Sequence, residues 1–178
     1  MDFLQKNWEE IGVSSALSSY ISPSGPSEYH VQFHVKPRND GFVQQYERLL
    51  HALRLVCAEL LPADARPVLK RYYLSDATNQ APLMQPDDSC TVSVIQQPPL
   101  DGSKVSLWVY FIVGADVQCR DGVTVVDHGG YRHFWHMGME HPCGDSAAQT
   151  EQLLTGYEAE LTASGLNLAD DCVRTWFF

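Results

Sequence analysis

Residues 66–80, RPVLKRYYLSDATNQ, decide the fold class, because they contain a strand that leads into a turn. β-branched and aromatic side chains are dense here, and Arg71 and Tyr73 alternate with Tyr72 and Leu74, a pattern typical of a strand. Residues 75–79, SDATN, carry the small polar side chains that favour turns. The stretch therefore predicts a strand that is closed by a loop.

Three neighbouring segments also predict strands. Residues 90–95, CTVSVI, and 104–112, KVSLWVYFI, are joined by QQPPLDGS, where prolines cannot donate to a sheet and Asp-Gly favours a turn. Upstream, residues 29–35, YHVQFHV, place aromatic and aliphatic side chains on one face and His30, Gln32 and His34 on the other. This alternation is typical of a half-buried strand.

A helix is predicted between the strand at 29–35 and the strand that begins near Val68. Asp40 can cap its start near Gly41, and the helix runs to about Leu61. Apolar residues at steps of three and four form one wide stripe: Phe42, Tyr46, Leu49, Leu50, Leu53, Val56, Cys57 and Leu60. The order strand, helix, strand, strand, strand predicts an α+β fold with the helix on one sheet face.

Composition limits the possible functions. The chain has 178 residues, of which 44% are hydrophobic, enough for one core or for one domain and part of another. A net charge of −10 with only 12 basic residues argues against a nucleic-acid partner. The five cysteines form no CxxC pair, which favours reduced thiols and a cytoplasmic location. The acidic amino terminus and the lack of a long apolar run predict neither a signal peptide nor a membrane span.

The pattern divides the chain into three parts. Residues 1–27 are a leader that ends in SPSGPS, and residues 28–115 hold the first domain. Residues 116–178 form the third part. It begins in a linker or turn that covers 114–122 and continues as the truncated start of a second domain. In that part we expect strands at 123–126 and 131–137, and a helix capped by Asp145 or Ser146 and ended by Gly165. The final residues, VRTWFF, are β-formers that predict a last strand.

Two groups of histidines are candidate metal sites. His30 and His34 share a strand face, but two histidines without a third ligand fall short of a site. Residues 128–143 contain four histidines and Cys143, yet no HExxH or CxxC is present. A strand there would point His133 and His136 to opposite faces. Exposed polar strand faces are favoured over metal, and no cofactor is expected.

LKRYYLSD, SCTVSV and PPLDGSKVSLWVY resemble the last three strands of the Rid superfamily, also called the YjgF or endoribonuclease L-PSP family. GGYRH at 129–133 and the stretch 149–178 resemble the first two-thirds of a second such domain. The chain thus resembles the amino-terminal part of a longer protein with tandem Rid-like domains, an arrangement also seen in chorismatases.

This resemblance implies a chorismate-mutase-like fold and a homo-oligomer, trimer or dimer, with ligand clefts between subunits. Active members hydrolyse enamines and imines, and an arginine before the SerCys-type strand holds the substrate carboxylate as a bidentate pair. Here that position is Asp88, preceded by Asp87, and the water-positioning carboxylate of the last strand falls near Trp108. The first domain therefore lacks both chemical groups.

Five residues are candidates for a ligand site. Arg71 and Arg174 hold equivalent places in KRYY and VRTW, where each could reach a cleft, pair with Asp76 or Asp170, or lie with its stem packed on the sheet. Asn79, together with Gln80, follows the turn and could line the same cleft. Asp88 stands at the arginine position, and Tyr131 matches a family tyrosine near the cleft.

Two functions remain open. In the first, the domain has lost catalysis and binds a small metabolite or serves as an oligomerisation scaffold. In the second, the longer protein is an enamine or imine deaminase, or a chorismatase-like hydrolase, whose active site needs the second domain. RNase activity is disfavoured by the acidic charge.

Overall fold

The chain has an α+β fold, seen in a computed structural model that describes residues 1–142 and 144–177. Its contacts form two compact units, Met1–Met137 and Gly138–Phe178. Cys143, the last residue of the histidine-rich run, and Phe178 lie outside the described residues. No described helix is both long and apolar enough to span a membrane.

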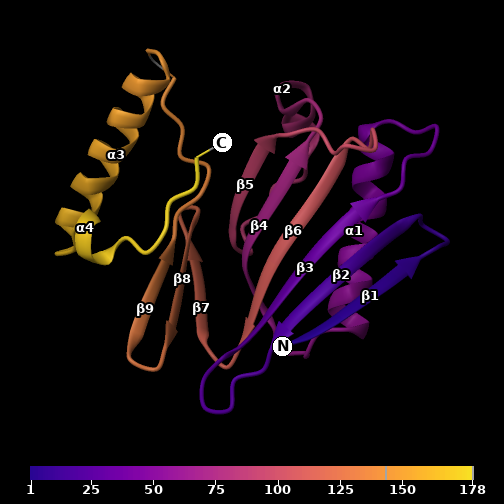
Figure 1. Cartoon of the computed structure of the whole chain (residues 1–178), viewed down its shortest axis with the longest axis horizontal. Coiled ribbons are helices and arrows are strands. Elements are labelled where there is room, and N and C mark those ends of the chain that lie inside the picture. The colour runs from indigo at the N-terminus through magenta and orange to yellow at the C-terminus, as the bar shows by residue number, and fades with distance from the viewer. Residues whose placement is uncertain (143, 178) are drawn as a thin grey trace. The chain divides into compact units, whose positions relative to one another are not determined.

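A six-stranded mixed sheet is the centre of the first unit (Figure 1). Its strand order is β1-β2-β3-β6-β4-β5, and the β4–β5 pair is parallel whereas the other pairs are antiparallel. The strands predicted at 29–35, 68–74, 90–95 and 104–112 are confirmed with small shifts of their ends. The bounds are β1 Asp2–Trp8, β2 Val13–Tyr20, β3 Ser27–Val35, β4 Arg66–Leu74, β5 Thr91–Gln96 and β6 Val105–Val113.

Helix α1, Phe42–Glu59, covers one face of this sheet, as its apolar stripe predicted. Phe42, Tyr46, Leu49 and Val56 are buried against inward-facing residues of β3, β4 and β6. The expected cap was wrong: Gly41 is the N-cap residue, and no side chain caps the helix. The Asp40 carboxylate instead accepts hydrogen bonds from Arg48 and Gln45, which explains why it does not bond the first turn.

Residues 1–27, assigned to a leader by sequence, contribute β1 and β2 to the sheet. The serines of β2, VSSALSSY, conceal its alternation, since Val13, Ser15 and Leu17 are all buried on the α1 face. Ser15 is tolerated there because its hydroxyl accepts a hydrogen bond from Trp8 Nε1 at 3.0 Å.

A three-stranded antiparallel meander follows β6 and is formed by β7 Asp116–Arg120, β8 Val123–His128 and β9 Tyr131–Trp135. The expected linker at 114–122 is therefore wrong, because most of it is strand β7. Val126 of β8 packs with Val68, Leu69, Tyr110 and Ile112 in a second apolar cluster on the sheet face opposite α1. The six-stranded sheet is thus covered on both faces in the region of β4 and β6.

The second unit contains helix α3, Ser146–Ala163, and the short helix α4, Leu168–Asp171. Asp145 caps α3 by accepting from the Ala148 amide, and Gly165 has φ +75°, as expected of a left-handed terminator. The expected strand at 173–178 is absent from its described part, 173–177.

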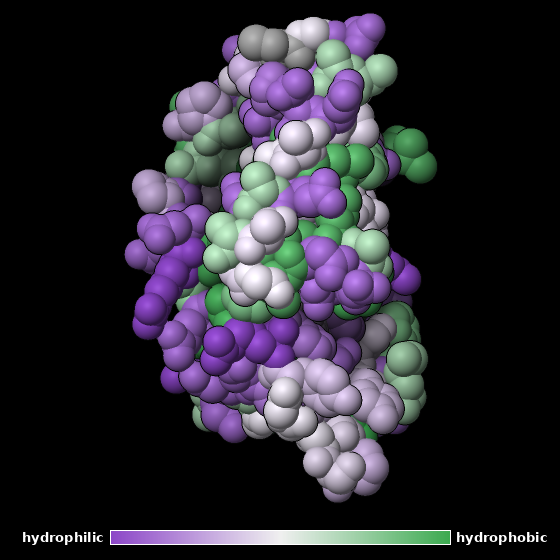
Figure 2. Space-filling model, turned by 90° about the vertical axis from the view of Figure 1, so that its left-hand side faces the viewer, coloured by the Kyte–Doolittle hydropathy of each residue, from purple (hydrophilic) through white to green (hydrophobic). Residues whose placement is uncertain are grey.

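Few apolar side chains are buried in this second unit. Leu161 is the single buried apolar residue among its described positions, whereas Val173, Trp176 and Phe177 are exposed. Figure 2 views the molecule from the side on which Figure 1 draws α3, and hydrophobic and hydrophilic residues are interleaved there. The α3 stripe is only half covered, so this unit has little core of its own.

Candidate functional site

A cavity of about 240 Å³ lies beside the edge strand β5, on the same sheet face as α1. Tyr72 of β4 and Val94 of β5 are register partners, and their parallel pairing sets their side chains next to each other on this face. The connection between the two strands closes the other side of the cavity. It consists of helix α2 Ala77–Gln80, the 3₁₀ turn η1 Ala81–Leu83 and the loop after it. We call this cavity the β5 pocket; its lining residues are Tyr72, Ala81, Met84, Gln85, Pro86, Asp87, Val92 and Val94.

A partly buried ion pair borders the β5 pocket. Lys70 of β4, two residues before Tyr72 on the same strand face, lies 2.5 Å from an oxygen of Asp87. Its ammonium also donates to Ser89 Oγ at 3.0 Å. The Lys70 side chain is 10% exposed and that of Asp87 26%, so Asp87 carries the more accessible charge of the pair.

Asp87 is held in its charged form by these neighbours. Burial raises its pKa, but the hydrogen bonds from Lys70 and Ser89 and the charge of Lys70 outweigh burial and lower the pKa below the ordinary aspartate value. Ser89 donates to the carboxylate through its hydroxyl at 2.6 Å and its backbone amide at 3.1 Å. At neutral pH Asp87 is therefore a fixed hydrogen-bond acceptor on the pocket wall.

Tyr72, one of the lining residues, is paired with a second tyrosine, Tyr46. The hydroxyls of Tyr46, from α1, and Tyr72 are hydrogen-bonded, and their rings meet edge to face with centroids 6.0 Å apart. Burial raises the pKa of both hydroxyls. Both tyrosines are neutral at physiological pH, so they add polarity and no charge.

The groups around the pocket offer no activated nucleophile. Burial raises the pKa of the Cys90 thiol to about 11, which leaves it protonated and unreactive at neutral pH. Ser89 donates to a carboxylate whose lowered pKa makes it a weak base. The arrangement can bind a molecule through one acceptor and an apolar wall, but these groups do not include a nucleophile next to a base that could activate it.

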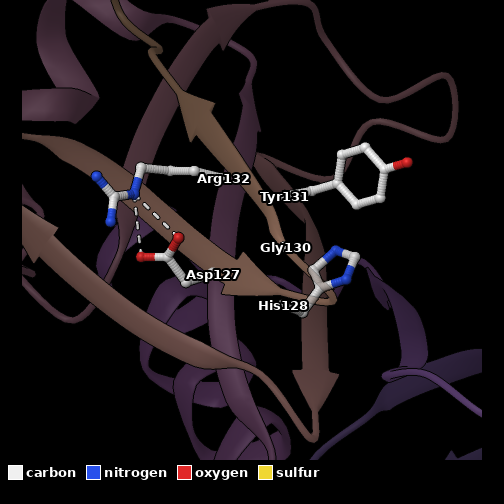
Figure 3. Close-up of a pocket in the computed structure, with 5 residues that line it drawn as sticks. All are labelled: Asp127, His128, Gly130, Tyr131 and Arg132. Atoms are coloured by element: carbon white, nitrogen blue, oxygen red, sulfur yellow. Dashed lines mark hydrogen bonds and ion pairs between the residues drawn. The ribbon is translucent and has the colours of Figure 1, made fainter.

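A second hollow lies over the β8–β9 hairpin and is lined by Asp127, His128, Gly130, Tyr131 and Arg132. Figure 3 shows Tyr131 and His128 on one side of the hairpin and the Arg132–Asp127 ion pair on the other. Tyr131 is 69% exposed, and the hollow is open to solvent. It lacks the enclosing walls that a small-molecule site requires.

Four of the five predicted site residues lie in the first unit, at different places. Arg71 is buried on the face opposite α1, with its guanidinium 5.3 Å from the centroid of the Trp108 ring. Asn79 is exposed on α2, where its side chain donates to Asp76 at 2.7 Å. Asp88 is exposed beside the β5 pocket, and its neighbour Asp87, rather than Asp88, lines it. Tyr131 belongs to the hollow on the β8–β9 hairpin.

Arg174, the fifth predicted residue, belongs to the second unit. It is exposed, and its guanidinium lies 5.5 Å from the centroid of the Trp176 ring. The Asp170 carboxylate, proposed as its partner, accepts a hydrogen bond from the Asn167 side chain at the start of α4, and the Asp170 amide donates to Asn167 Oδ1.

The histidines make aromatic and ionic contacts. His30 stacks on Tyr110 with ring centroids 4.6 Å apart, and His34 Nε2 lies 2.9 Å from a carboxylate oxygen of Asp101. The rings of His128 and His133 meet edge to face, with their centroids 4.9 Å apart. Within the described residues, no three His, Cys, Asp or Glu side chains are grouped as metal ligands.

Sequence reasoning missed the residues that form the β5 pocket. Lys70 and Tyr72 are two residues apart on one strand, and Val92 and Val94 are two apart on the next. This spacing indicated that each pair shares a strand face. Nothing in that spacing indicated which face carries a cavity. The 81–89 connection decides this, because it returns Asp87 to Lys70, 17 residues earlier in the chain.

Comparisons of this chain with protein-family models, with curated proteins and with solved structures found no match. The chemistry of the site is therefore the basis for its function.

Proposed function

We propose that residues 1–115 form a Rid-type domain that has lost catalysis and binds a small metabolite in the β5 pocket. The observation that carries this proposal is a partly open pocket with a largely apolar wall, one fixed carboxylate acceptor, Asp87, and no arginine or activated nucleophile among its lining residues. Cavities of this kind, with few polar groups, are the usual form of small-molecule sites. A volume of about 240 Å³ limits the ligand to a small one.

The chorismate-mutase-like fold is part of the proposal. Its support is the order of elements, a strand, a helix and three strands in a mixed sheet with the helix on one face. Trp108, at the place of the family's catalytic carboxylate, is paired with Gln32 and Arg71 and lies on the face opposite the pocket. An indole there cannot accept a proton from water as a carboxylate does, which supports a loss of catalysis.

Residues 116–178 are proposed as the first part of a second, tandem domain. Their element order repeats that of the amino-terminal part: β7, β8 and β9 form an antiparallel meander followed by α3, as β1, β2 and β3 are followed by α1. Both helices have 18 residues.

A homo-oligomer, trimer or dimer, is also proposed from the resemblance. Edge strand β1 exposes Phe3 and Leu4, and the end of β2 and the residue after it expose Tyr20 and Ile21; their exposed fractions are 47–68%. Exposed apolar residues that gather in a patch commonly mark an interface. Light scattering coupled to size-exclusion chromatography measures the state directly.

The test of the proposed function combines binding and catalysis. Ligand-observed NMR with a panel of small neutral and charged aromatic compounds reports binding, and Val94→Trp fills the pocket. We expect Val94→Trp to abolish the signals, whereas Leu100→Trp, at a fully exposed loop position, leaves them unchanged. Ammonia release from freshly generated 2-aminoacrylate should not exceed that in buffer.

Two outcomes would contradict the proposal. Clear acceleration of 2-aminoacrylate hydrolysis by the chain would show an active deaminase and favour the alternative function. Binding that survives in Val94→Trp, with the variant folded by circular dichroism, would place the ligand outside the β5 pocket.

A further inference from the structure

We infer that the β5 pocket selects a small apolar amine, bound through its ammonium to Asp87, and rejects the carboxylates expected for a Rid-type cleft. This inference rests on the proposed function and names the ligand class of the same site. It depends on which charge the ion pair presents to the cavity.

Asp87, and not Lys70, faces the cavity. Asp87 is one of the lining residues, whereas the Lys70 side chain is absent from the lining and only 10% exposed. The Lys70 ammonium is already bonded to Asp87 and Ser89. A ligand carboxylate would therefore meet the Asp87 carboxylate first, and the cation behind it would offer little compensation.

Asp87 keeps room for one more donor. A carboxylate can accept about four hydrogen bonds. The Ser89 amide and hydroxyl both donate to Oδ1, and Lys70 donates to Oδ2. An ammonium group can donate to the remaining acceptor site, and such a charge-assisted bond is roughly twice as strong as a neutral one.

The charge around the pocket mouth also favours a cationic ligand. Lys70 contributes one positive charge, and Asp87 and the exposed Asp88 contribute two negative charges, so this group is net negative. Opposite charges attract most strongly where water is partly excluded.

The rest of the wall suits the apolar part of such a ligand. Val92, Val94 and Met84 provide aliphatic and thioether contacts, and Tyr72, Ala81, Gln85 and Pro86 complete the surface. Methionine adapts its shape to irregular ligands and contacts aromatic rings favourably. A phenyl ring on a short chain that ends in an ammonium therefore matches both the wall and its one acceptor.

The experiment compares three probes of nearly equal size: 2-phenylethylamine, 2-phenylethanol and phenylacetate, which are cationic, neutral and anionic at pH 7. Isothermal titration calorimetry with the full chain measures each affinity. We expect 2-phenylethylamine to bind about tenfold tighter than phenylacetate, because one charge-assisted hydrogen bond is gained and one repulsion avoided.

Two variants change this preference in opposite directions. Asp87→Asn leaves the Lys70 ammonium without its carboxylate, so the preference should shift toward phenylacetate. Lys70→Gln leaves Asp87 without its cation, so the preference for 2-phenylethylamine should increase. Since either variant alone could fail to fold, circular dichroism selects the folded one, and each gives a separate prediction.

The outcomes distinguish the two proposals. If phenylacetate binds the parent as tightly as the amine, and Val94→Trp abolishes that binding, the pocket is correct and the ligand class is wrong. If other compounds bind the pocket while none of the three probes does, the ligand class is also wrong. If no compound of the wider panel depends on Val94, both proposals fail.

Discussion

Lys70 Nζ on β4 lies 2.5 Å from Asp87 Oδ2 in the loop before β5, and this ion pair attaches the carboxyl end of the 81–89 connection to the sheet. The pair is mostly removed from water, and such pairs cost desolvation that their attraction only partly repays. Its place at the wall of the β5 pocket is better explained by a binding role than by stability.

Breaking this pair should destabilise the fold. Lys70→Met leaves the Asp87 carboxylate without its cation, and we expect a loss of about 1–3 kcal/mol in the free energy of unfolding, less than for a fully buried pair because water still reaches Asp87. Urea denaturation at pH 7 measures the change. The double variant with Asp87→Asn should lose less than the sum of the single variants, and strict additivity would show that the two side chains are not coupled.

Acid should weaken the fold partly through Asp87. Its pKa is lowered in the folded chain, so its contribution to stability is fully present above about pH 5 and is lost as pH falls through the folded pKa, below the unfolded value of about 3.9. Urea midpoints between pH 7 and pH 3 should therefore fall less steeply for Asp87→Asn than for the parent.

Other acids contribute to the same slope. The pKa values of Asp40 and Asp101 are also lowered, against the effect of burial, by hydrogen bonds from Arg48 and Gln45 and from Ser103 respectively. Asp87→Asn should thus reduce the pH dependence without removing it. Parallel curves for Asp87→Asn and the parent would contradict the assignment.

The meander should depend on one hydrogen bond to the edge of the main sheet. The buried Thr124 hydroxyl on β8 accepts from the Thr91 amide of β5 at 2.7 Å. Thr124→Val keeps the shape but leaves that amide without its acceptor, and we expect a loss of about 1–3 kcal/mol. Thr124→Ser retains the hydroxyl and is the matched control.

Chemical denaturation and hydrogen exchange measure this effect. The exchange rate of the Thr91 amide should rise in Thr124→Val and change much less in Thr124→Ser. An unchanged Thr91 rate in the valine variant would show that β8 does not protect this edge.

Much of the secondary structure follows from local patterns. The spacing of Phe42, Tyr46, Leu49 and Val56 predicted α1, and alternation predicted β3, because each pattern reports which side of an element is buried. β2 was missed because Ser15 occupies a core position, which only its bond to Trp8 makes tolerable. The last strand was predicted wrongly, since β-formers need a partner strand, and residues 173–177 pair with none in the part that the structure describes.

Sequence alone determined that the chain is acidic and that Asp87 and Asp88 directly precede the segment 89–95, and it predicted a helix on one face of a sheet. Tertiary structure decided which of these acids matters: the parallel pairing of β4 and β5 and the course of their connection turn Asp87 to Lys70 and the cavity and leave Asp88 exposed. The physical reason is that alternation and helical period are local properties of neighbouring residues. A cavity and an ion pair depend on contacts between residues far apart in the chain, which no local pattern encodes.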